Sequence, residues 1–315
     1  MMNNIIKTIE KNQSFIILPH LKPDGDAIGS SLALAKGLKK INKNVKIISL
    51  DEVPYDVEFL NREDYFVDSI DMESIDIIFA LDSSDIERLE DRKEFLVKPI
   101  VNIDHHITNT LYGDLNLVKE DACATGEIIY NLLNSLRINI DREIATDIYT
   151  AIASDTGNFM YSNTNAKTHE IVANLITKGI DVAEISMYLY QNTPLNKFKF
   201  NTEILSRVEF FFDNKVALVA ISNELKDKHK CGNTDSIVES IRNIEGVEVA
   251  ILIDERINET KVSMRSKKDI DVSSIALNNG GGGHVNAAGF ESDLDIESTK
   301  KNIVKELGTI YEGIS

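Results

Sequence analysis

A histidine and two aspartates crowd within seven residues near the start of this 315-residue chain, and side chains of these types can bind a metal ion. His20, Asp24 and Asp26 lie on a predicted turn between two elements. The apolar run 15–18 before them predicts a short buried strand, and the apolar spacing from Ile28 onward predicts a helix. Carboxylates held this close repel each other, which favours a bound divalent cation. A purely structural interpretation is also open, with Asp24 in a turn and Asp26 capping the helix.

Three more places in the first half of the chain put aspartate or histidine at the end of a predicted element. In open sheets of parallel strands, ligands bind in the crevice outside the carboxyl ends of the strands. A single aspartate there is usually a cap or a turn residue, but four such places together favour a shared metal site. The additional places are Asp82 after the strand 75–81, Asp104, His105 and His106 after the strand 100–103, and Asp155 at the end of a helix.

The types of ligand indicate which metals suit such a site. The set mixes carboxylate and imidazole groups without thiolate, which disfavours a structural zinc site and suits Mn²⁺, with Mg²⁺ or Co²⁺ as alternatives. A single ion that keeps one coordination position open for the reaction normally binds fewer than six protein ligands. They fit two ions that share one carboxylate, the arrangement used for in-line phosphoryl hydrolysis.

The elements that must position these residues alternate along the chain. Short apolar strands and amphipathic helices alternate in the first half, which predicts an α/β fold with a mostly parallel sheet and helices on both faces. The second half predicts a smaller α/β domain that includes a hairpin over 210–222. We therefore predict domains over 1–192 and 206–315, joined by a linker over 193–205, with the active site in the cleft between the domains.

The composition limits the binding partners and the cellular compartment that we expect for this chain. A net charge of −17 argues against a broad basic surface for long duplex nucleic acid, although a few cations in one cleft could still bind an anionic substrate. Two cysteines, Cys123 and Cys231, fit a reducing compartment without a disulfide framework. We find neither a targeting segment nor a long apolar run, so we expect a cytoplasmic protein without a membrane partner.

Six segments, in this order, resemble the DHH phosphoesterase superfamily and its DHH-associated C-terminal domain. Four segments in the first half are similar to the motifs of the catalytic domain, and two in the second half are similar to the associated domain. DGD or DHH alone is a weak signal, whereas the ordered set with the glycine run is highly specific. Within the superfamily, the length and two-domain layout are most similar to the nanoRNase and pAp phosphatases. The segments are HLKPDGDAIGS, ALDSSD, DHH and SDTG, followed by VSMRS and GGGGHVNAAGF.

The resemblance implies a role for each of these aspartates and histidines. His106 would face the substrate or the leaving oxygen, and Asp104 would orient a histidine from behind it. A scaffold role for His106 also stays open, because adjacent side chains on extended backbone point in opposite directions. Together with Asp82, these two residues form the predicted catalytic set. The implied metal ligands are His20, Asp24 and Asp82 for one ion, and Asp26, Asp82, His105 and Asp155 for the other.

A run of four glycines followed by His284 lies between two helical patterns in the second half. Its freed backbone N–H groups, opening onto a helix, would form an anion cradle, although a flexible linker would also explain the glycines. Arg265 ends a predicted strand and can bind a phosphate through both arms of its guanidinium group. The resemblance assigns both elements to substrate binding, which implies contacts with a terminal nucleotide or phosphate. The predicted substrate-binding residues are Ser263, Arg265, Gly281, Gly282, Gly283 and His284.

The resemblance implies a metal-dependent phosphodiesterase and phosphatase that acts on short RNA oligonucleotides and phosphorylated nucleotides. The expected reactions release mononucleotides from very short RNA and convert pAp to AMP and phosphate. Alternatives are hydrolysis of pApA in a cyclic-dinucleotide pathway, a RecJ-like single-strand exonuclease, and a nucleotide-binding sensor without turnover. The intact set of metal ligands argues against the sensor, and we find no segment that resembles the added oligonucleotide-binding domain of the exonucleases. A homodimer is compatible with the sequence.

Overall fold

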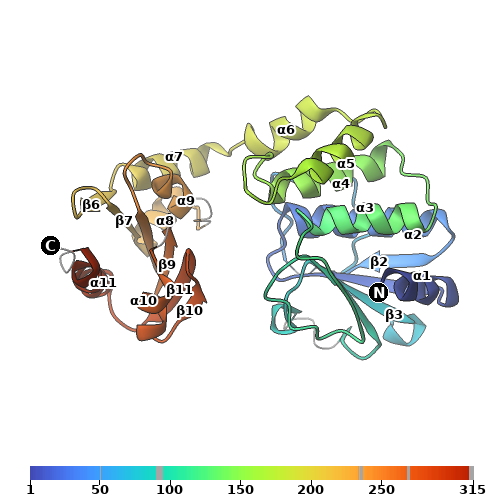
Figure 1. Cartoon of the computed structure of the whole chain (residues 1–315), viewed down its shortest axis with the longest axis horizontal. Helices are drawn as coiled ribbons and strands as arrows, with labels where there is room; N and C mark the ends of the chain where they lie inside the picture. Colours follow the sequence, from blue (N-terminus) through green and yellow to red (C-terminus); the bar gives the residue numbers. More distant parts are fainter. Residues whose placement is uncertain (50, 90–94, 233, 235–236, 268–269, 312–315) are drawn as a thin grey trace. The chain divides into compact units, whose positions relative to one another are not determined.

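The chain divides into two compact units, Met1–Asn192 and Thr193–Ser315, and each unit contains its own sheet (Figure 1). Every helix among the described residues is too short or too polar to cross a membrane. The computed structural model describes residues 1–49, 51–89, 95–232, 234, 237–267 and 270–311.

The first unit is a five-stranded parallel sheet with helices packed against it, which confirms the predicted α/β class with a parallel sheet (Figure 1). The strand order is β2-β1-β3-β4-β5, and every neighbouring pair is parallel. Sheets of this order bind ligands where the winding direction reverses, outside the carboxyl ends of β1 and β3. The elements are α1 (Met2–Lys11), β1 (Ser14–Pro19), α2 (Gly25–Lys40), β2 (Asn44–Ile47), the 3₁₀ helix η1 (Met72–Ser74), β3 (Ile77–Leu81), β4 (Ile100–Asp104), β5 (Leu115–Val118), α3 (Thr125–Ser135), α4 (Arg142–Asp155), α5 (Ala166–Ile176) and α6 (Val182–Tyr190).

The register of the sheet aligns the ends of its three central strands. Pro19 of β1 pairs with Leu81 of β3, and Leu81 pairs in turn with Ile103 of β4. Because the strands are parallel, the residues that follow them leave the sheet at the same edge. His20 after β1 and Asp82 after β3 are therefore neighbours in space although they are far apart in the sequence.

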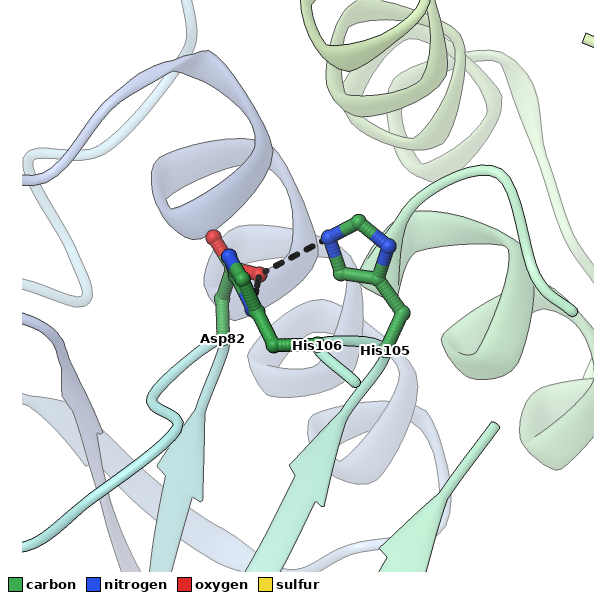
Figure 2. Close-up of side chains that lie close together, drawn as sticks. All are labelled: Asp82, His105 and His106. Carbon is green, nitrogen blue, oxygen red and sulfur yellow. Dashed lines mark ion pairs between the residues drawn. The ribbon is translucent and has the colours of Figure 1, made fainter. Parts of the chain in front are cut away.

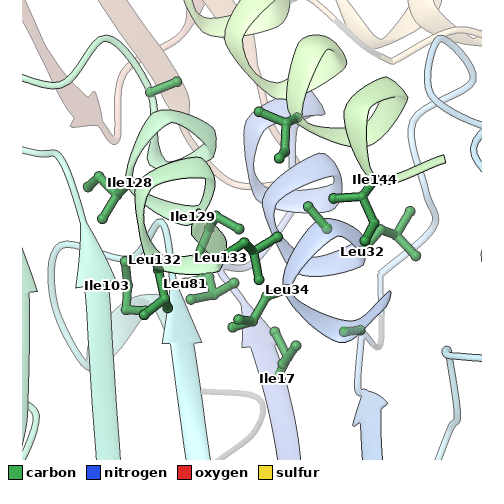
Figure 3. Packing of buried hydrophobic residues seen from close by; sticks show 14 of the residues in the cluster. Ile17, Leu32, Leu34, Leu81, Ile103, Ile128, Ile129, Leu132, Leu133 and Ile144 are labelled. Carbon is green, nitrogen blue, oxygen red and sulfur yellow. The ribbon is translucent and has the colours of Figure 1, made fainter. Parts of the chain in front are cut away.

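Apolar side chains on one face of this sheet form the larger core of the unit. Ile17, Leu81 and Ile103 pack there against apolar residues of α2 and α3, including Leu34 and Leu132 (Figure 3). Helix α4 packs on α2 and α3, and α5 and α6 pack on α4. Each fully buried leucine or isoleucine contributes about 1.5–3 kcal/mol, so this core holds the strand ends and the starts of α2 and α3 in place.

The opposite face of the sheet carries a smaller core that includes Ile16, Leu18 and Ile78. Its cover comes from η1 and from irregular segments between β2 and β4, whereas α-helices were expected on both faces. The described residues of 48–76 form no α-helix. That stretch is acidic and lacks an apolar stripe of helical period, so a helix there would have no face to bury.

The second unit contains a six-stranded sheet of order β10-β11-β9-β8-β7-β6, in which only β7 and β8 pair in parallel. Strands β6 and β7 form the hairpin predicted over 210–222. Helices α10 and α11 cover one face, and α7, α8 and α9 pack on the other. The elements are α7 (Leu195–Leu205), within the range predicted as the linker, β6 (Glu209–Phe211), β7 (Val216–Ile221), α8 (Asn223–His229), α9 (Ile237–Arg242), β8 (Val249–Glu255), β9 (Thr260–Ser266), α10 (Ser273–Asn278), β10 (Gly282–His284), β11 (Ala287–Ser292) and α11 (Ile296–Tyr311).

The expectation that the glycine run opens onto a helix is wrong, because the run leads into the β10–β11 hairpin. A Cβ atom on Gly281 would lie 2.2 Å from the carbonyl oxygen of Gly289, so the backbones approach too closely for a side chain. Gly283 has a φ of +138°, which favours glycine. The N–H of Gly281 donates to the carbonyl of Ala276 at 2.8 Å and is not free to bind an anion. Hairpin geometry therefore explains the glycines.

A buried ion pair joins α2 to α4. The Lys36 ammonium lies 2.7 Å from Oδ2 of Asp147, and these side chains are only 4% and 1% exposed. The helices approach so closely that a Cβ atom on Gly29 would lie 2.5 Å from the carbonyl oxygen of Asp147. Burial raises the pKa of Asp147 to about 7, although Lys36 acts in the opposite direction. Each of the two charges is therefore tolerated in the interior because the other one compensates it.

We expect Lys36→Met to lower the free energy of unfolding by about 3–5 kcal/mol at pH 8, because it leaves the Asp147 carboxylate buried and unpaired. At pH 5, below the raised native pKa, the Asp147 carboxyl is protonated and uncharged, so the loss should be smaller. Urea unfolding at both pH values measures this difference, and Lys36→Met with Asp147→Leu should recover most of the loss. The control is Lys40→Met, which breaks the exposed pair with Asp141 between the same helices and should cost about 0–1 kcal/mol. Equal losses in the two single variants would contradict the prediction.

Candidate metal centre

The first unit brings seven of the predicted side chains together at the carboxyl edge of its sheet. His20 follows β1, Asp82 follows β3 and His105 follows β4. Asp82 has a φ of +57°, a left-handed conformation that aspartate tolerates better than most residues. Ligand atoms of these side chains form groups that lie within 4.8 Å of one another. The groups are His20, Asp24 and Asp82; Asp26, His105 and Asp155; and Asp82, His105 and His106.

The first group combines one imidazole with two carboxylates. Nε2 of His20 lies 3.5 Å from Oδ2 of Asp82 and 3.9 Å from Oδ1 of Asp24. Nδ1 of His20 lies 2.7 Å from the carbonyl oxygen of Leu21, and a proton donated there leaves the lone pair of Nε2 facing the carboxylates. Asp24 also caps α2 by accepting hydrogen bonds from the N–H groups of Asp26 and Ala27. Asp24 therefore caps α2 and also lies beside His20, whereas the structural interpretation placed Asp24 in a turn and assigned the cap to Asp26.

The second group surrounds His105. Its Nε2 lies 3.6 Å from Oδ2 of Asp155 and 3.9 Å from Oδ2 of Asp26. Asp26 is almost fully buried and does not cap its own helix. Its carboxylate instead accepts the N–H groups of Thr125 and Gly126, at 2.6 and 2.9 Å, at the start of α3. A carboxylate at a helix N-terminus is stabilised by the unpaired N–H groups and the helix dipole.

Asp82 lies between the two groups, as its predicted bridging role requires. Its Oδ2 is 3.5 Å from Nε2 of His20. Its Oδ1 is 3.6 Å from Nε2 of His105 (Figure 2). The hydroxyl of Thr125 donates to the same Oδ1 at 3.0 Å. One carboxylate therefore presents a different oxygen to each histidine.

His106 differs from the other two histidines because a carboxylate already binds its ring. Its Nδ1 lies 2.7 Å from Oδ1 of Asp104. The same nitrogen lies 3.7 Å from Oδ1 of Asp82 (Figure 2). Asp104 is fully buried, and its other oxygen accepts a hydrogen bond from Asn109 at 2.6 Å. Asp104 is thus held in place and orients the imidazole of His106.

The electrostatics of the site reflect its crowded carboxylates. Burial raises the pKa of Asp26 well above its usual range, and the charges of Asp82 and Asp155 raise it further. Burial also raises the pKa of Asp155 to about 6. Burial lowers the pKa of His20, but its contacts with Asp24 and Asp82 outweigh this effect and raise it to about 9. A hydrogen bond with Asp104 raises the pKa of His106. Excess negative charge of this kind is what a divalent cation would neutralise.

The donor set fits divalent metal ions. It consists of carboxylate oxygens and imidazole nitrogens, the ligands that suit Mn²⁺ and similar ions. Cys123 is buried and belongs to none of the groups. The site therefore has the chemistry expected of a centre for divalent cations.

Sequence reasoning missed several residues that hold the ligands. Thr125 contacts both Asp26 and Asp82, and Asn163 donates to Oδ2 of Asp155 at 3.3 Å. Ala124 begins α3 without a side-chain cap, which is the one local signal that this helix end needs an acceptor from elsewhere. The other missed contact, from Asn109 to Asp104, lies in an irregular segment without a recognisable spacing.

The predicted substrate-binding side chains lie in the second unit, on one face of its sheet. Arg265 of β9 pairs with Ala287 of β11, which pairs in turn with His284 of β10. Side chains that are paired directly across antiparallel strands share a face, so Arg265 and His284 point to the same side as Ser263. The apolar residues that alternate with them face α10 and α11. Small side chains separate Arg265 from His284, which leaves a polar face on β9, β11 and β10.

A missed residue also positions Arg265. Nε of Arg265 lies 3.1 Å from Oε1 of Glu239 in α9, and one of its terminal N–H groups donates to the carbonyl of Met264. A guanidinium group has five N–H donors, so three remain for other acceptors once its contacts with described residues are counted. The arginine is oriented by these contacts and still able to bind an anion.

Comparison with known proteins identifies the class of protein. Residues 14–154 match the DHH family, N-terminal domain, and residues 213–312 match the DHHA1 domain. The chain therefore belongs to the DHH family of phosphoesterases, and its second unit contains a DHHA1 domain.

Individual relatives span nearly the whole chain. The bifunctional oligoribonuclease and PAP phosphatase NrnA of Thermus thermophilus is 32% identical over 303 residues, which cover 96% of this chain and 90% of that protein. The protein of the same name from Bacillus subtilis is 28% identical, with 92% of each chain covered. The crystal structure of an exopolyphosphatase-related protein from Bacteroides fragilis matches with a TM-score of 0.88 and 25% identity, covering 99% of this chain and 96% of that one.

We expect Thr125→Val to weaken Mn²⁺ binding by about 10–100-fold, because Asp82 loses the hydroxyl that orients it. The measurement is the rise of the thermal unfolding midpoint with added Mn²⁺, which reports binding to the folded state without any substrate. Thr125→Ser keeps the hydroxyl and should retain the response, and Glu170→Gln, an exposed change in α5, serves as the control. An unchanged Mn²⁺ response in Thr125→Val would show that this hydroxyl does not support the site.

Proposed function

We propose that the chain is a two-metal phosphoesterase that releases mononucleotides from very short RNA and converts pAp to AMP and phosphate. The observation that carries this proposal is the position of Asp82, whose two oxygens face His20 and His105 in separate ligand groups. The names of the NrnA relatives, which describe an oligoribonuclease and a PAP phosphatase, supply the two substrate classes.

The same geometry suggests how the ligands divide between two ions. Mn²⁺ suits the donors best, with Mg²⁺ or Co²⁺ as alternatives. When bound, two such ions would supply the positive charge that activates water and stabilises the phosphoryl oxygens in the transition state. The proposed ligands are His20, Asp24 and Asp82 for one ion, and Asp26, Asp82, His105 and Asp155 for the other.

His106 is the proposed donor to the leaving oxygen. Its Nδ1 is occupied by Asp104, so Nε2 is the ring atom that remains for a substrate. The side chain is 35% exposed, whereas His20 and His105 are 4% and 14% exposed, which supports contact with substrate over metal binding. Asp104 would hold the ring orientation and favour a proton on Nδ1.

The polar face of the second unit supports a role in binding the phosphate of the substrate. Arg265 keeps free N–H donors, His284 is exposed, and Ser263 adds a hydroxyl two residues before the arginine. Gly282 and Gly283 would contribute by leaving space beside these groups. Phosphate binding by this polar face replaces the earlier expectation that the glycine run forms an anion cradle at a helix N-terminus.

The charge of the chain favours short substrates. A net charge of −17 repels a polyanionic backbone wherever that backbone extends beyond a local cluster of cations. A dinucleotide or pAp carries few phosphates and escapes most of this repulsion. Short RNA and phosphorylated nucleotides are therefore better candidates than a long strand.

A product assay with Mn²⁺ tests the proposal on end-labelled RNA of two to five nucleotides, pAp, pApA and a long single strand. We expect mononucleotides from the short RNA and phosphate from pAp. Asp82→Ala should lower both rates at least about a hundredfold, since it removes several kcal/mol of metal-mediated stabilisation. Glu170→Gln should leave both rates unchanged.

Other outcomes of this assay would contradict the proposal in different ways. A strong preference for pApA would assign the chain to cyclic-dinucleotide turnover, and activity confined to the long strand would assign it to the exonucleases. Nucleotide binding without any product at saturating Mn²⁺ would indicate a sensor. A near-normal rate in metal-replete Asp82→Ala protein would contradict the proposal that Asp82 is shared by two metal ions.

We expect Arg265→Ala to raise KM by about 10–100-fold, with a much smaller fall in kcat, because a charge-assisted hydrogen bond contributes about 1.5–3 kcal/mol of binding. Steady-state kinetics on pAp separates the two parameters. Lys305→Ala removes an exposed positive charge from α11 of the same unit and should change neither. A collapse of kcat at constant KM would mean that Arg265 acts in the transition state.

A further inference from the structure

A second concave site lies at the end of the first sheet that is opposite to the metal centre. It is a cavity of about 690 Å³ beside the amino ends of β1 and β2 and the last turn of α2. The metal ligands follow the carboxyl ends of the strands, so the sheet separates the two sites. The lining residues that matter for ligand chemistry are Lys39, Lys43, Lys46, Asp64, Val45 and Ile70.

Three lysines give this cavity a positive charge in a strongly acidic chain. Nζ of Lys43 lies 2.7 Å from the carbonyl oxygen of Asn12, and Nζ of Lys46 lies 2.8 Å from that of Asp64. Nζ of Lys39 lies 5.0 Å from the centre of the Tyr65 ring. Within the described part of the chain, none of the three forms an ion pair with a carboxylate.

The neutral partners of these lysines leave their charge available. Lys43 also reaches the carbonyl of Glu10, so it stabilises the C-terminus of α1, which is a sufficient structural reason for one positive charge. Lys39, in the last turn of α2, likewise suits a helix C-terminus, whereas Lys46 on the same cavity wall lies in strand β2. An ammonium group has three donors, and carbonyl contacts use one or two of them.

Acidic groups near the cavity offset the lysines only in part. Among the described residues that line the cavity, Asp64 is the one that carries a carboxylate, and its side chain is exposed. Lys39 also lines a smaller neighbouring cavity together with Asp141 and Glu143. Asp76 lies close enough for Lys43 to lower its pKa, but its Oδ2 accepts the N–H groups of Gln13 and Ser14. The lining therefore carries three positive charges and one negative charge, while the whole chain has a net charge of −17.

The remaining walls indicate that the ligand has an organic part as well as a charge. Val45, Ile70 and Ile75 contribute apolar surface, and Ser14 and Asn44 contribute polar groups. Sites for small ligands typically have volumes of about 300–1,000 Å³ and combine apolar walls with a few polar groups. A cavity of this size and lining suits a phosphorylated molecule with a flat ring better than it suits a bare ion.

We propose that this cavity binds a phosphate monoester of mononucleotide size, with the phosphate on the three lysines and the ring against the apolar wall. The site is separate from the metal centre and does not depend on the proposed function. If that function also holds, mononucleotide products would meet a second site on the enzyme that forms them.

The test is labelling of the whole protein with pyridoxal 5′-phosphate, a phosphate monoester whose aldehyde forms an imine with a nearby lysine amine. Borohydride reduction fixes the label, and peptide mass spectrometry locates it, so binding at the metal centre does not interfere. We expect label on Lys39, Lys43 or Lys46 in preference to Lys301, an exposed lysine of α11. AMP should protect these lysines, and adenosine, which lacks the phosphate, should not.

A variant keeps the test independent of folding effects. The Lys39 ammonium lies over the face of the Tyr65 ring and has no hydrogen bond or ion pair with another described residue, so Lys39→Gln should leave the fold intact and make protection by AMP about tenfold weaker. Lys301→Gln is the matched control and should change nothing. Uniform labelling of surface lysines, or a failure of AMP to protect, would overturn the proposal. Equal protection by adenosine or by inorganic phosphate would also overturn it, because phosphate and ring must both contribute.

Discussion

Repulsion among the carboxylates at the carboxyl edge of the first sheet is the constraint on which the rest of the site depends. Asp26, Asp82 and Asp155 converge there, and burial together with mutual repulsion raises the pKa of Asp26 and Asp155. Carboxylates in this arrangement need compensation from hydrogen-bond donors, from imidazoles and from cations. The parallel register maintains the crowding, because it ends β1, β3 and β4 at the same level, and the leucine and isoleucine core beneath those strands resists any relaxation.

The start of α3 supplies much of this compensation without contributing a metal ligand. Thr125 and Gly126 give their N–H groups to Asp26, and the Thr125 hydroxyl reaches Asp82. The helix is fixed in turn by its packing against α2 and α4. Core packing and site electrostatics are therefore connected, since the apolar residues that position α3 also decide where its unpaired N–H groups point.

In the second unit, close packing of the backbone determines where the polar side chains lie, whereas in the first unit the site is defined by crowded carboxylates. Its glycine run permits β10 to approach β11, and small residues on β11 leave Arg265 and His284 on an open polar face. Glu239 occupies one edge of the guanidinium group and leaves the remaining donors accessible. Arginine with several free donors on an accessible face is suited to binding phosphate, which is consistent with a phosphoesterase of the DHH family.

The sequence by itself determined the family, the parallel sheet and the residues that meet at its carboxyl edge, because strand ends and short motifs are local features. His20, Asp82 and His105 could be identified in this way. Only the tertiary structure decided that Asp26 accepts hydrogen bonds from α3 and that each oxygen of Asp82 faces a different histidine. It also decided that the glycine run forms a hairpin. Such contacts join segments that are distant in the chain, so they depend on packing and register, which no local pattern of residues encodes.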